Sequence, residues 1–255
     1  MNTVQIVRIK AALVLCTVIL ASTVFLAPPV WAKDKQANPT DAVDSGSFGV
    51  YTSGHRVATE TFNIKQGPNG SIVTSTFKSA QGEQQAEQSS ELQLTPSVDL
   101  RRYEWKELSP EKTVAVVTPN DTFLIERFGE GPESKQHEQN FLLPASTLVL
   151  DDYFFVHREV LAWKYLATAC KKDKGPVQCP MKQPVQFGAL NPHGRSSMSV
   201  SIEFQGREKL TFRGAEHEFS KFVLKSEVGD WAFWLDDQFK LVRLLNDGGT
   251  EVLRD

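Results

Sequence analysis

The chain has 255 residues, of which 40% are hydrophobic, 23% charged and 10% aromatic, and its formal net charge is -3. This composition is that of a globular protein and argues against intrinsic disorder. The charge balance, with a pI near 6.0, also lacks the strong positive field of a dedicated nucleic-acid binder, so we expect no nucleic-acid partner.

Residues 1–32 have the three parts of a secretory signal peptide. Arg8 and Lys10 precede an apolar run over residues 11–27, and Val30 and Ala32 suit the positions that signal peptidase reads. We predict cleavage after Ala32 and an exported protein, periplasmic or extracellular, with no transmembrane span in the mature chain. Its net charge would be -5, because residues 1–32 carry two cations and no anion. The competing interpretation is an uncleaved anchor, because the apolar run approaches the roughly 20 residues that cross a bilayer.

Two cysteines remain after residue 32, namely Cys170 and Cys179. An even pair in an exported chain predicts a disulfide, here closing a short polar loop rich in turn-forming residues. A redox pair would need C-x-x-C spacing, and a metal site would need further ligands. We therefore predict a structural disulfide and no metal site.

The rest of the chain divides into a polar leader and one β-domain. Residues 33–46 are polar and aperiodic, which predicts a flexible leader, and residues 47–255 are predicted to form a single antiparallel β-domain with one amphipathic helix. Residues 58–65 and 72–78 alternate as a hairpin, in which an Asn69-Gly70 turn would place Phe62 opposite Phe77. Residues 197–204 and 209–213 also alternate, and a shared buried face requires a three-residue loop or a bulge at 206–208.

The exception to the two-residue period is the segment 151–169. Its apolar residues recur at helical spacing, with Glu159 and Lys164 expected toward solvent and Asp151 as the N-cap. We therefore predict an all-β fold with one main helix. Its architecture would be a large curved antiparallel sheet or incomplete barrel packed on helix 151–169.

No pattern of catalytic residues stands out. The five histidines, none at the spacing of a known metal motif, are His55, His137, His157, His193 and His217. The chain has no G-x-S-x-G around a serine, and the pairs Asp151-Asp152 and Asp236-Asp237 fall at element boundaries, where Asp serves caps and turns. We predict no catalytic residue and no cofactor.

The apolar residues exceed what a one-sided sheet needs. Residues 231–235 are apolar on both faces, and the segment after them continues that character. Strands of this kind are covered by other elements on both faces, or they line a hydrophobic cavity on one face. The two interpretations are therefore an ordinary filled core and a ligand cavity. The candidate lining residues are Phe155, Trp163, Trp231, Trp234 and Phe239.

The order of elements resembles a known group of proteins. The segments that carry the likeness are residues 54–62, Leu142-Leu143-Pro144-Ala145 before the helix, Trp234-Leu235-Asp236, 241–243 and 250–254. They are similar to exported bacterial proteins of unknown function, which in turn resemble the half-barrel (β-clam) sheets of periplasmic lipoprotein carriers. The likeness covers most of the mature chain through pattern rather than a motif. It implies an incomplete barrel around a helix with an apolar interior that takes acyl chains, and it carries over no catalytic residue.

We therefore expect a non-enzymatic exported binder or carrier of an amphiphilic ligand such as a lipid. Two alternatives stay open. One is a cell-envelope scaffold or protein-interaction module that docks an envelope protein through strand edges or the acidic segment 83–91. The other is a hydrolase whose His, Asp and Glu residues converge only in the folded chain.

Overall fold

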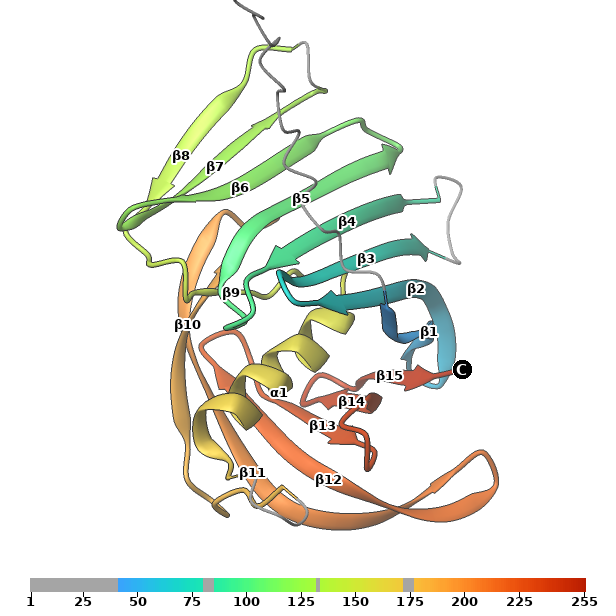
Figure 1. Cartoon of the computed structure of the whole chain (residues 1–255). Helices are drawn as coiled ribbons and strands as arrows, with labels where there is room; N and C mark the ends of the chain where they lie inside the picture. The colour runs from blue at the N-terminus through green and yellow to red at the C-terminus, as the bar shows by residue number, and fades with distance from the viewer. Residues whose placement is uncertain (1–40, 80–84, 132–133, 172–176) are drawn as a thin grey trace, which may run out of the picture. The chain divides into compact units, whose positions relative to one another are not determined.

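The computed structural model of the chain describes residues 41–79, 85–131, 134–171 and 177–255. The predicted signal peptide, residues 33–40 of the predicted leader and the middle of the predicted disulfide loop lie outside these ranges. Within them the chain forms one large sheet and one α-helix, α1 (Val156–Ala169) (Figure 1). The strands are β1 (Asp41–Thr52), β2 (His55–Gly67), β3 (Gly70–Ser79), β4 (Glu87–Leu94), β5 (Leu100–Ser109), β6 (Val114–Asn120), β7 (Phe123–Gly129), β8 (His137–Phe141), β9 (Leu148–Val149), β10 (Val185–Asn191), β11 (Ser196–Phe212), β12 (Ala215–Ser226), β13 (Trp231–Leu235), β14 (Leu241–Asn246) and β15 (Thr250–Arg254).

The 15 strands of the described residues lie in the order β8-β7-β6-β5-β4-β3-β2-β1-β15-β14-β13-β12-β11-β10-β9. Every neighbouring pair is antiparallel except β9 with β10, and the pairing of β1 with β15 joins the two halves of the chain. The sheet curves around α1 and stays open (Figure 1). The predicted fold class, a large curved sheet packed on one helix, is confirmed.

The folded part begins earlier than the sequence predicts. Of the residues assigned to the leader, 41–46 belong to β1, where Ala42 pairs with Lys65 and Gly46 with Phe62. Most of these residues are small or polar, so the hydrophobic alternation by which a strand is recognised in the sequence is missing here. Asp44 is buried and bound by Arg254, which also ties this segment to the last strand.

The hairpin of β2 and β3 forms with a register two residues from the predicted one. Its turn is Pro68-Asn69, flanked by the pair Gly67 and Gly70, so Phe62 lies opposite Ser75 rather than Phe77. Gly70 is the first residue of β3, and only glycine fits there because a Cβ would lie 1.9 Å from the carbonyl oxygen of Leu94 on β4. A shift of two residues leaves every side chain on its predicted face.

The predicted irregularity at residues 206–208 is a bulge. β11 is one strand of 17 residues, and its register with β12 shifts between Phe204 and Gly206. Gly206 has a φ of +111°, which a glycine adopts without strain. The bulge keeps Phe204 on the face that packs against the core.

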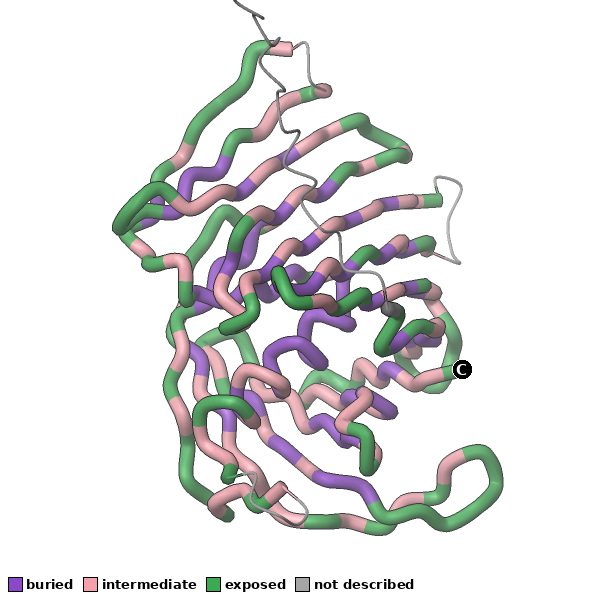
Figure 2. Tube along the Cα trace, in the orientation of Figure 1, coloured by how far each residue is buried: buried purple, intermediate pink, exposed green. Residues whose placement is uncertain are grey.

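The helix α1 is shorter and more deeply enclosed than predicted. It begins at Val156, so residues 151–155 of the predicted helix precede it, and the N-cap position is Phe155 rather than Asp151. Every residue from Val156 to Ala162 is buried, including Glu159, which the sequence places toward solvent (Figure 2). The curved sheet leaves no side of the first turns facing water, whereas Ala167 and Thr168 near the other end are exposed.

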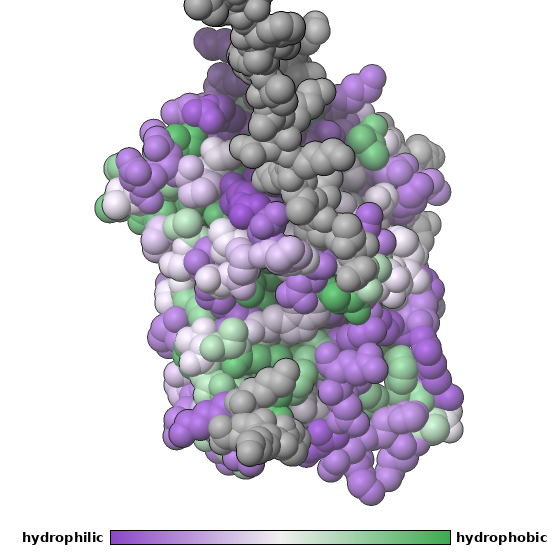
Figure 3. All heavy atoms as spheres, viewed as in Figure 1, coloured by the Kyte–Doolittle hydropathy of each residue, from purple (hydrophilic) through white to green (hydrophobic). Residues whose placement is uncertain are grey.

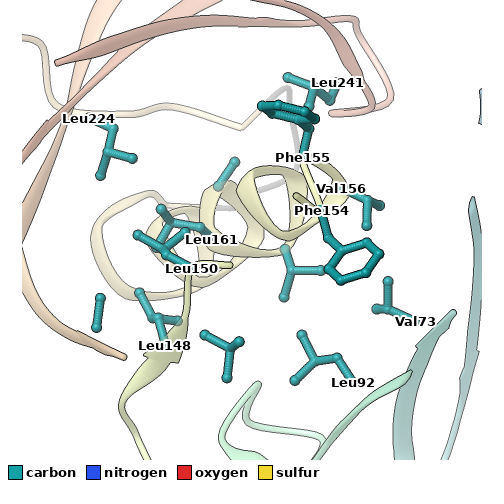
Figure 4. Packing of buried hydrophobic residues seen from close by; sticks show 14 of the residues in the cluster. Val73, Leu92, Leu148, Leu150, Phe154, Phe155, Val156, Leu161, Leu224 and Leu241 are labelled. Atoms are coloured by element: carbon teal, nitrogen blue, oxygen red, sulfur yellow. The ribbon is translucent and has the colours of Figure 1, made fainter. Parts of the chain in front are cut away.

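The core lies between α1 and the concave face of the sheet. Figure 4 shows Leu148, Phe154 and Leu161 among side chains from both halves of the sheet, such as Leu92 and Leu224. The interior is therefore filled largely by the protein's own side chains. In the part of the chain described, no helix is long and apolar enough to span a bilayer.

Candidate functional site

An apolar groove of about 630 Å³ lies beside the second half of α1. Its size is that of a small-molecule site. Apolar atoms gather over α1 among hydrophilic ones in Figure 3. The groove is lined by Val43, Gln66, Ser71, Leu94, Pro96, Val98, Trp163, Leu166, Ala167, Cys170, Val177, Gln238, Phe239 and Lys240.

The structure separates the five predicted lining residues into three places. Trp163 and Phe239 line the groove together, and the indole Nε1 of Trp163 donates to the backbone oxygen of Phe239 at 2.9 Å. Phe155 and Trp231 do not line it, and each ring lies 5.1 Å from the guanidinium carbon of Arg158. Arg158 itself is buried at the start of α1.

Trp234 belongs to a separate small cluster with Phe219 and Val242. Its neighbour Phe233 packs in the main core instead, because successive residues of a strand point to opposite faces. This second cluster explains why residues 231–235 are apolar on both faces. Much of the apolar surplus is thus a second packed cluster rather than the lining of a cavity.

The predicted disulfide between Cys170 and Cys179 is present, directly after the last residue of α1. Both cysteines pack against the main core, and Cys170 also lines the groove. The bridge therefore fixes the chain where it leaves the helix, at one end of the groove.

Lys240 of the groove lining belongs to a cluster of charged side chains. Arg254 donates to both carboxylate oxygens of Asp44 and, at 3.3 Å, to Glu159, while Lys240 lies 3.4 Å from Asp44. Burial raises the pKa of Asp44, but the hydrogen bonds and charge of Arg254 outweigh it and leave this pKa below its usual value. Burial and the charge of Asp44 hold the pKa of Glu159 well above its usual value. Asp236 contributes a third carboxylate, whose charge also acts on Arg254. The two cations of the cluster therefore face three carboxylates.

A second polar group surrounds the start of α1. The buried carboxylate of Glu60 on β2 accepts hydrogen bonds from the backbone N–H of Phe155 at 2.7 Å and of Val156 at 3.3 Å, and from the hydroxyl of Ser75 at 2.7 Å. Glu60 is thus the cap of a helix 95 residues away. Burial raises its pKa to about 7, against the effect of these donors.

Asp151 and His193 form the closest carboxylate–histidine pair of the described residues. Nδ1 of His193 lies 2.7 Å from the Asp151 carboxylate, which also accepts from the hydroxyl of Tyr103 at 2.6 Å. Nε2 of His193 lies 2.7 Å from the amide oxygen of Gln88, and the ring stacks on Trp105 at 3.8 Å. In a catalytic triad this nitrogen would meet a nucleophile. Here it meets an amide, so the pair is arranged to hold in place the turn of residues 192–195, the His193 turn.

Sequence reasoning missed this pair because it interprets Asp151 as a helix cap. Its partners lie 42 and 48 residues away in the chain, and no spacing signals them. Burial raises the pKa of Asp151, but the hydrogen bond and charge of His193 outweigh it and leave this pKa below its usual value. A hydrolase would need a carboxylate, a histidine and a nucleophile in contact. Asp151 and His193 supply the first two, and no nucleophile of the described residues contacts the histidine.

Among the residues that the structure describes, two buried titratable side chains have no hydrogen-bond partner. Both carboxylate oxygens of Glu126 on β7 are unpartnered, and burial raises its pKa to about 7. Both ring nitrogens of His157 on α1 are unpartnered, and burial lowers its pKa to about 4, so the ring is neutral at pH 7. His157 and Thr147 line a cavity of about 10 Å³, at the lower limit of the space that one water needs.

The outer face of the sheet has a polar hollow of about 510 Å³ across β2 to β5. The side chains Thr61, Thr76 and Ser89 lie there, on the face opposite to the core residues of the same strands. Apart from Phe62, whose side chain is buried on the core face, the residues that line this hollow are polar or charged. We therefore regard the groove beside α1 as the candidate binding site.

No group of three or more metal-ligating side chains is placed to hold a metal ion within the described ranges. Comparison of the chain with protein-family models, curated proteins and solved structures found no significant match.

Proposed function

We propose that this protein is an exported binder or carrier of a single-chain anionic amphiphile, a long-chain carboxylate of the fatty-acid type, held in the groove beside α1. The observation that carries the proposal is the combination of an apolar groove of about 630 Å³ with Lys240 in its lining. An alkyl chain would gain from contact with Trp163 and Leu166, because burying apolar surface is favourable. The carboxylate would lie near Lys240.

Lys240 in the groove lining supports an anionic headgroup rather than a neutral one. Its ammonium lies 3.4 Å from Asp44, longer than a charge-assisted hydrogen bond, and Arg254 already binds both oxygens of that carboxylate. Lys240 can therefore meet a second anion. The ammonium of Lys240 attracts an anion at the groove. Export is supported by the signal-peptide pattern of residues 1–32 and by the disulfide, which is typical of oxidising compartments.

The test uses protein purified from the exported fraction of its host, whose intact mass also reports whether residues 1–32 are retained. Mass spectrometry of organic extracts should find a co-purified long-chain carboxylate. After delipidation, titration with oleate should change the tryptophan fluorescence, because Trp163 lines the groove. No extracted amphiphile together with no response to oleate would contradict the proposal, and a defined co-purified protein in its place would favour the envelope-scaffold alternative.

A pair of variants tests the headgroup assignment. Lys240→Gln should weaken oleate binding about 2- to 5-fold, the effect of one partly exposed ion pair, and leave binding of the neutral oleyl alcohol unchanged. Lys225→Gln, at an exposed lysine of β12, is the matched control and should leave both affinities unchanged. Equal weakening for the acid and the alcohol would contradict a role for the charge.

A further inference from the structure

Three turns of the sheet share one pattern of hydrogen bonds. They are residues 95–99 between β4 and β5, 236–240 between β13 and β14, and 246–250 between β14 and β15. In each, the N–H of the fourth residue donates to the backbone oxygen of the first, at 3.0, 2.9 and 3.1 Å respectively. The N–H of the fifth residue donates to the side-chain oxygen of the first, at 3.1, 2.9 and 2.7 Å.

The fourth residue of each turn has a left-handed backbone. In the third turn it is Gly249, with a φ of +81°, the residue type that takes this conformation without strain. The other two turns have Val98 and Phe239 there, each with a φ of +60°. A β-branched or bulky residue in this region is a strained outlier. The turn itself does not require them, because Gly249 makes the same hydrogen bonds.

Val98 and Phe239 both line the groove beside α1. The other non-glycine residues of positive φ in the described ranges are polar or charged, namely Ser53, Asp121, Lys182, Arg195 and Arg213. The two strained apolar residues therefore coincide with the one apolar groove that we assign to a ligand. Strain that the surrounding structure maintains is typical of ligand clamps and active sites.

Consecutive residues of α1 fasten the two turns. Trp163 donates to the backbone oxygen of Phe239, as described above, and Nζ of Lys164 donates to the backbone oxygen of Ser97 at 2.8 Å and to the Asp99 carboxylate at 2.7 Å. These bonds reach each turn from outside it. They hold both left-handed residues in place on the same stretch of the helix.

We infer that Val98 and Phe239 are the clamp of the groove, two apolar side chains that grip the alkyl part of the ligand at a cost in backbone strain. This inference rests on the proposed function. It predicts that removing either clamp side chain weakens oleate binding without lowering the Tm. Removing an ordinary packing residue of the groove would lower both.

The test replaces each clamp residue by Asn, which tolerates the left-handed conformation and lacks the apolar surface. Val98→Asn and Phe239→Asn should each weaken oleate binding roughly 5- to 30-fold. Their Tm should equal that of the wild type or exceed it by up to about 4 °C, because relief of strain offsets the lost packing. Phe239→Leu retains an apolar side chain at the same φ and should bind oleate nearly as well as the wild type.

Two further variants separate the clamp from ordinary packing and from the turn. Leu166→Asn changes a groove residue of helical backbone, so both oleate affinity and Tm should fall. Gly249→Val puts strain into the third turn, where no atom lies within 4 Å of the added Cβ, so Tm should fall and oleate affinity should stay unchanged.

Each outcome bears on one conclusion. If both Asn variants bind oleate as the wild type does, the clamp is wrong and the proposed binding site stands. If they lose as much Tm as Leu166→Asn, Val98 and Phe239 are ordinary packing residues and the clamp is again wrong. If the wild-type protein binds no oleate, the proposed function fails and the clamp fails with it.

Discussion

Glu126 is an acid whose surroundings favour its neutral form. It is fully buried on β7, its two carboxylate oxygens lack a hydrogen-bond partner, and burial raises its pKa to about 7. Such a carboxyl group has a higher pKa in the folded protein than in the unfolded chain. It stabilises the fold at pH values below its unfolded pKa, and this contribution is lost as the pH rises through its folded pKa. For Glu126 the window runs from about pH 4.5 to about pH 7.

Replacing Glu126 by Gln should remove this dependence, because the amide does not titrate. At pH 4.5 the variant should match the wild type, and at pH 8 it should be more stable by roughly 1–3 kcal/mol, as an ionised buried carboxylate is no longer present. Urea unfolding at the two pH values measures both differences, with Glu227→Gln, at an exposed glutamate, as control. A difference that is the same at pH 4.5 and pH 8 would contradict the argument.

Single residues were predictable from the sequence where burial alone decides their place. The sequence finds Phe155, Trp163 and Phe239 as interior residues, but not that Trp163 and Phe239 share a groove while Phe155 contacts Arg158. Cys170 and Cys179 could be paired by counting. Glu60, Glu126 and Asp151 could not be found, because a buried carboxylate follows no periodic pattern and its partners are distant in the chain.

At the scale of the element, α1 depends on a cap supplied by another strand. The N-cap position, Phe155, offers no side-chain hydrogen bond, and Glu60 on β2 accepts the first N–H groups instead. Helices leave their first N–H groups without an intrahelical acceptor, and a buried helix end needs one from elsewhere. The start of α1 is therefore determined by β2.

Glu60→Ala should lower the free energy of unfolding at pH 5 by about 1–3 kcal/mol, because it leaves buried N–H groups unpaired. At this pH the carboxyl group is protonated in the folded protein, so a lost charge does not contribute. Hydrogen exchange should show reduced protection of the Phe155 and Val156 amides. Glu60→Gln, which keeps one carbonyl acceptor, should cost less, and equal losses for the two variants would refute the capping role.

The elements were easier to predict than their boundaries, because the boundaries depend on contacts with other parts of the fold. Alternation identifies β2, β3 and β11, since one face of each packs on the core. The hairpin register differs by two residues, and Gly70 lies against Leu94 on β4, a tertiary neighbour that no local pattern signals. The helical period extends back to residue 151, but the cap from Glu60 sets the first turn at Val156.

At the scale of the whole sheet, the two ends meet at one turn. Residues 192–195 join β10 to β11, and His193 from this turn reaches Gln88 on β4, Trp105 on β5 and Asp151. The guanidinium of Arg195 lies 4.0 Å from the ring centre of Phe128 on β7, and its backbone oxygen accepts from Gln139 on β8 at 3.2 Å. This turn, the His193 turn, therefore links strands from opposite ends of an open sheet.

The curvature of the sheet was predictable in outline, because a long antiparallel series with one helix leaves the concave face as the place to pack it. The link at the His193 turn was not. Its bonds join residues 42 and 105 positions apart, and a histidine in a Pro-His-Gly turn is otherwise expected in solvent. Only the folded chain brings the partners together.

Replacing His193 by Ala should destabilise the whole fold. Asp151 would stay buried without the ring nitrogen that bonds to its carboxylate at 2.7 Å, and a buried group left without its hydrogen-bond partner costs about 1–3 kcal/mol. Denaturant unfolding should show this loss, whereas His55→Ala, at an exposed histidine, should leave stability unchanged.

Hydrogen exchange then distinguishes a link between the sheet ends from a local packing defect. The His193→Ala variant should lose protection in β7 and β8 and in β10 and β11 together, because both ends of the sheet are released. The central pair β1 and β15 should keep its protection, since its hydrogen bonds do not depend on the turn. Loss confined to residues 192–195, with β7 and β8 unchanged, would show that the turn does not hold the sheet around α1.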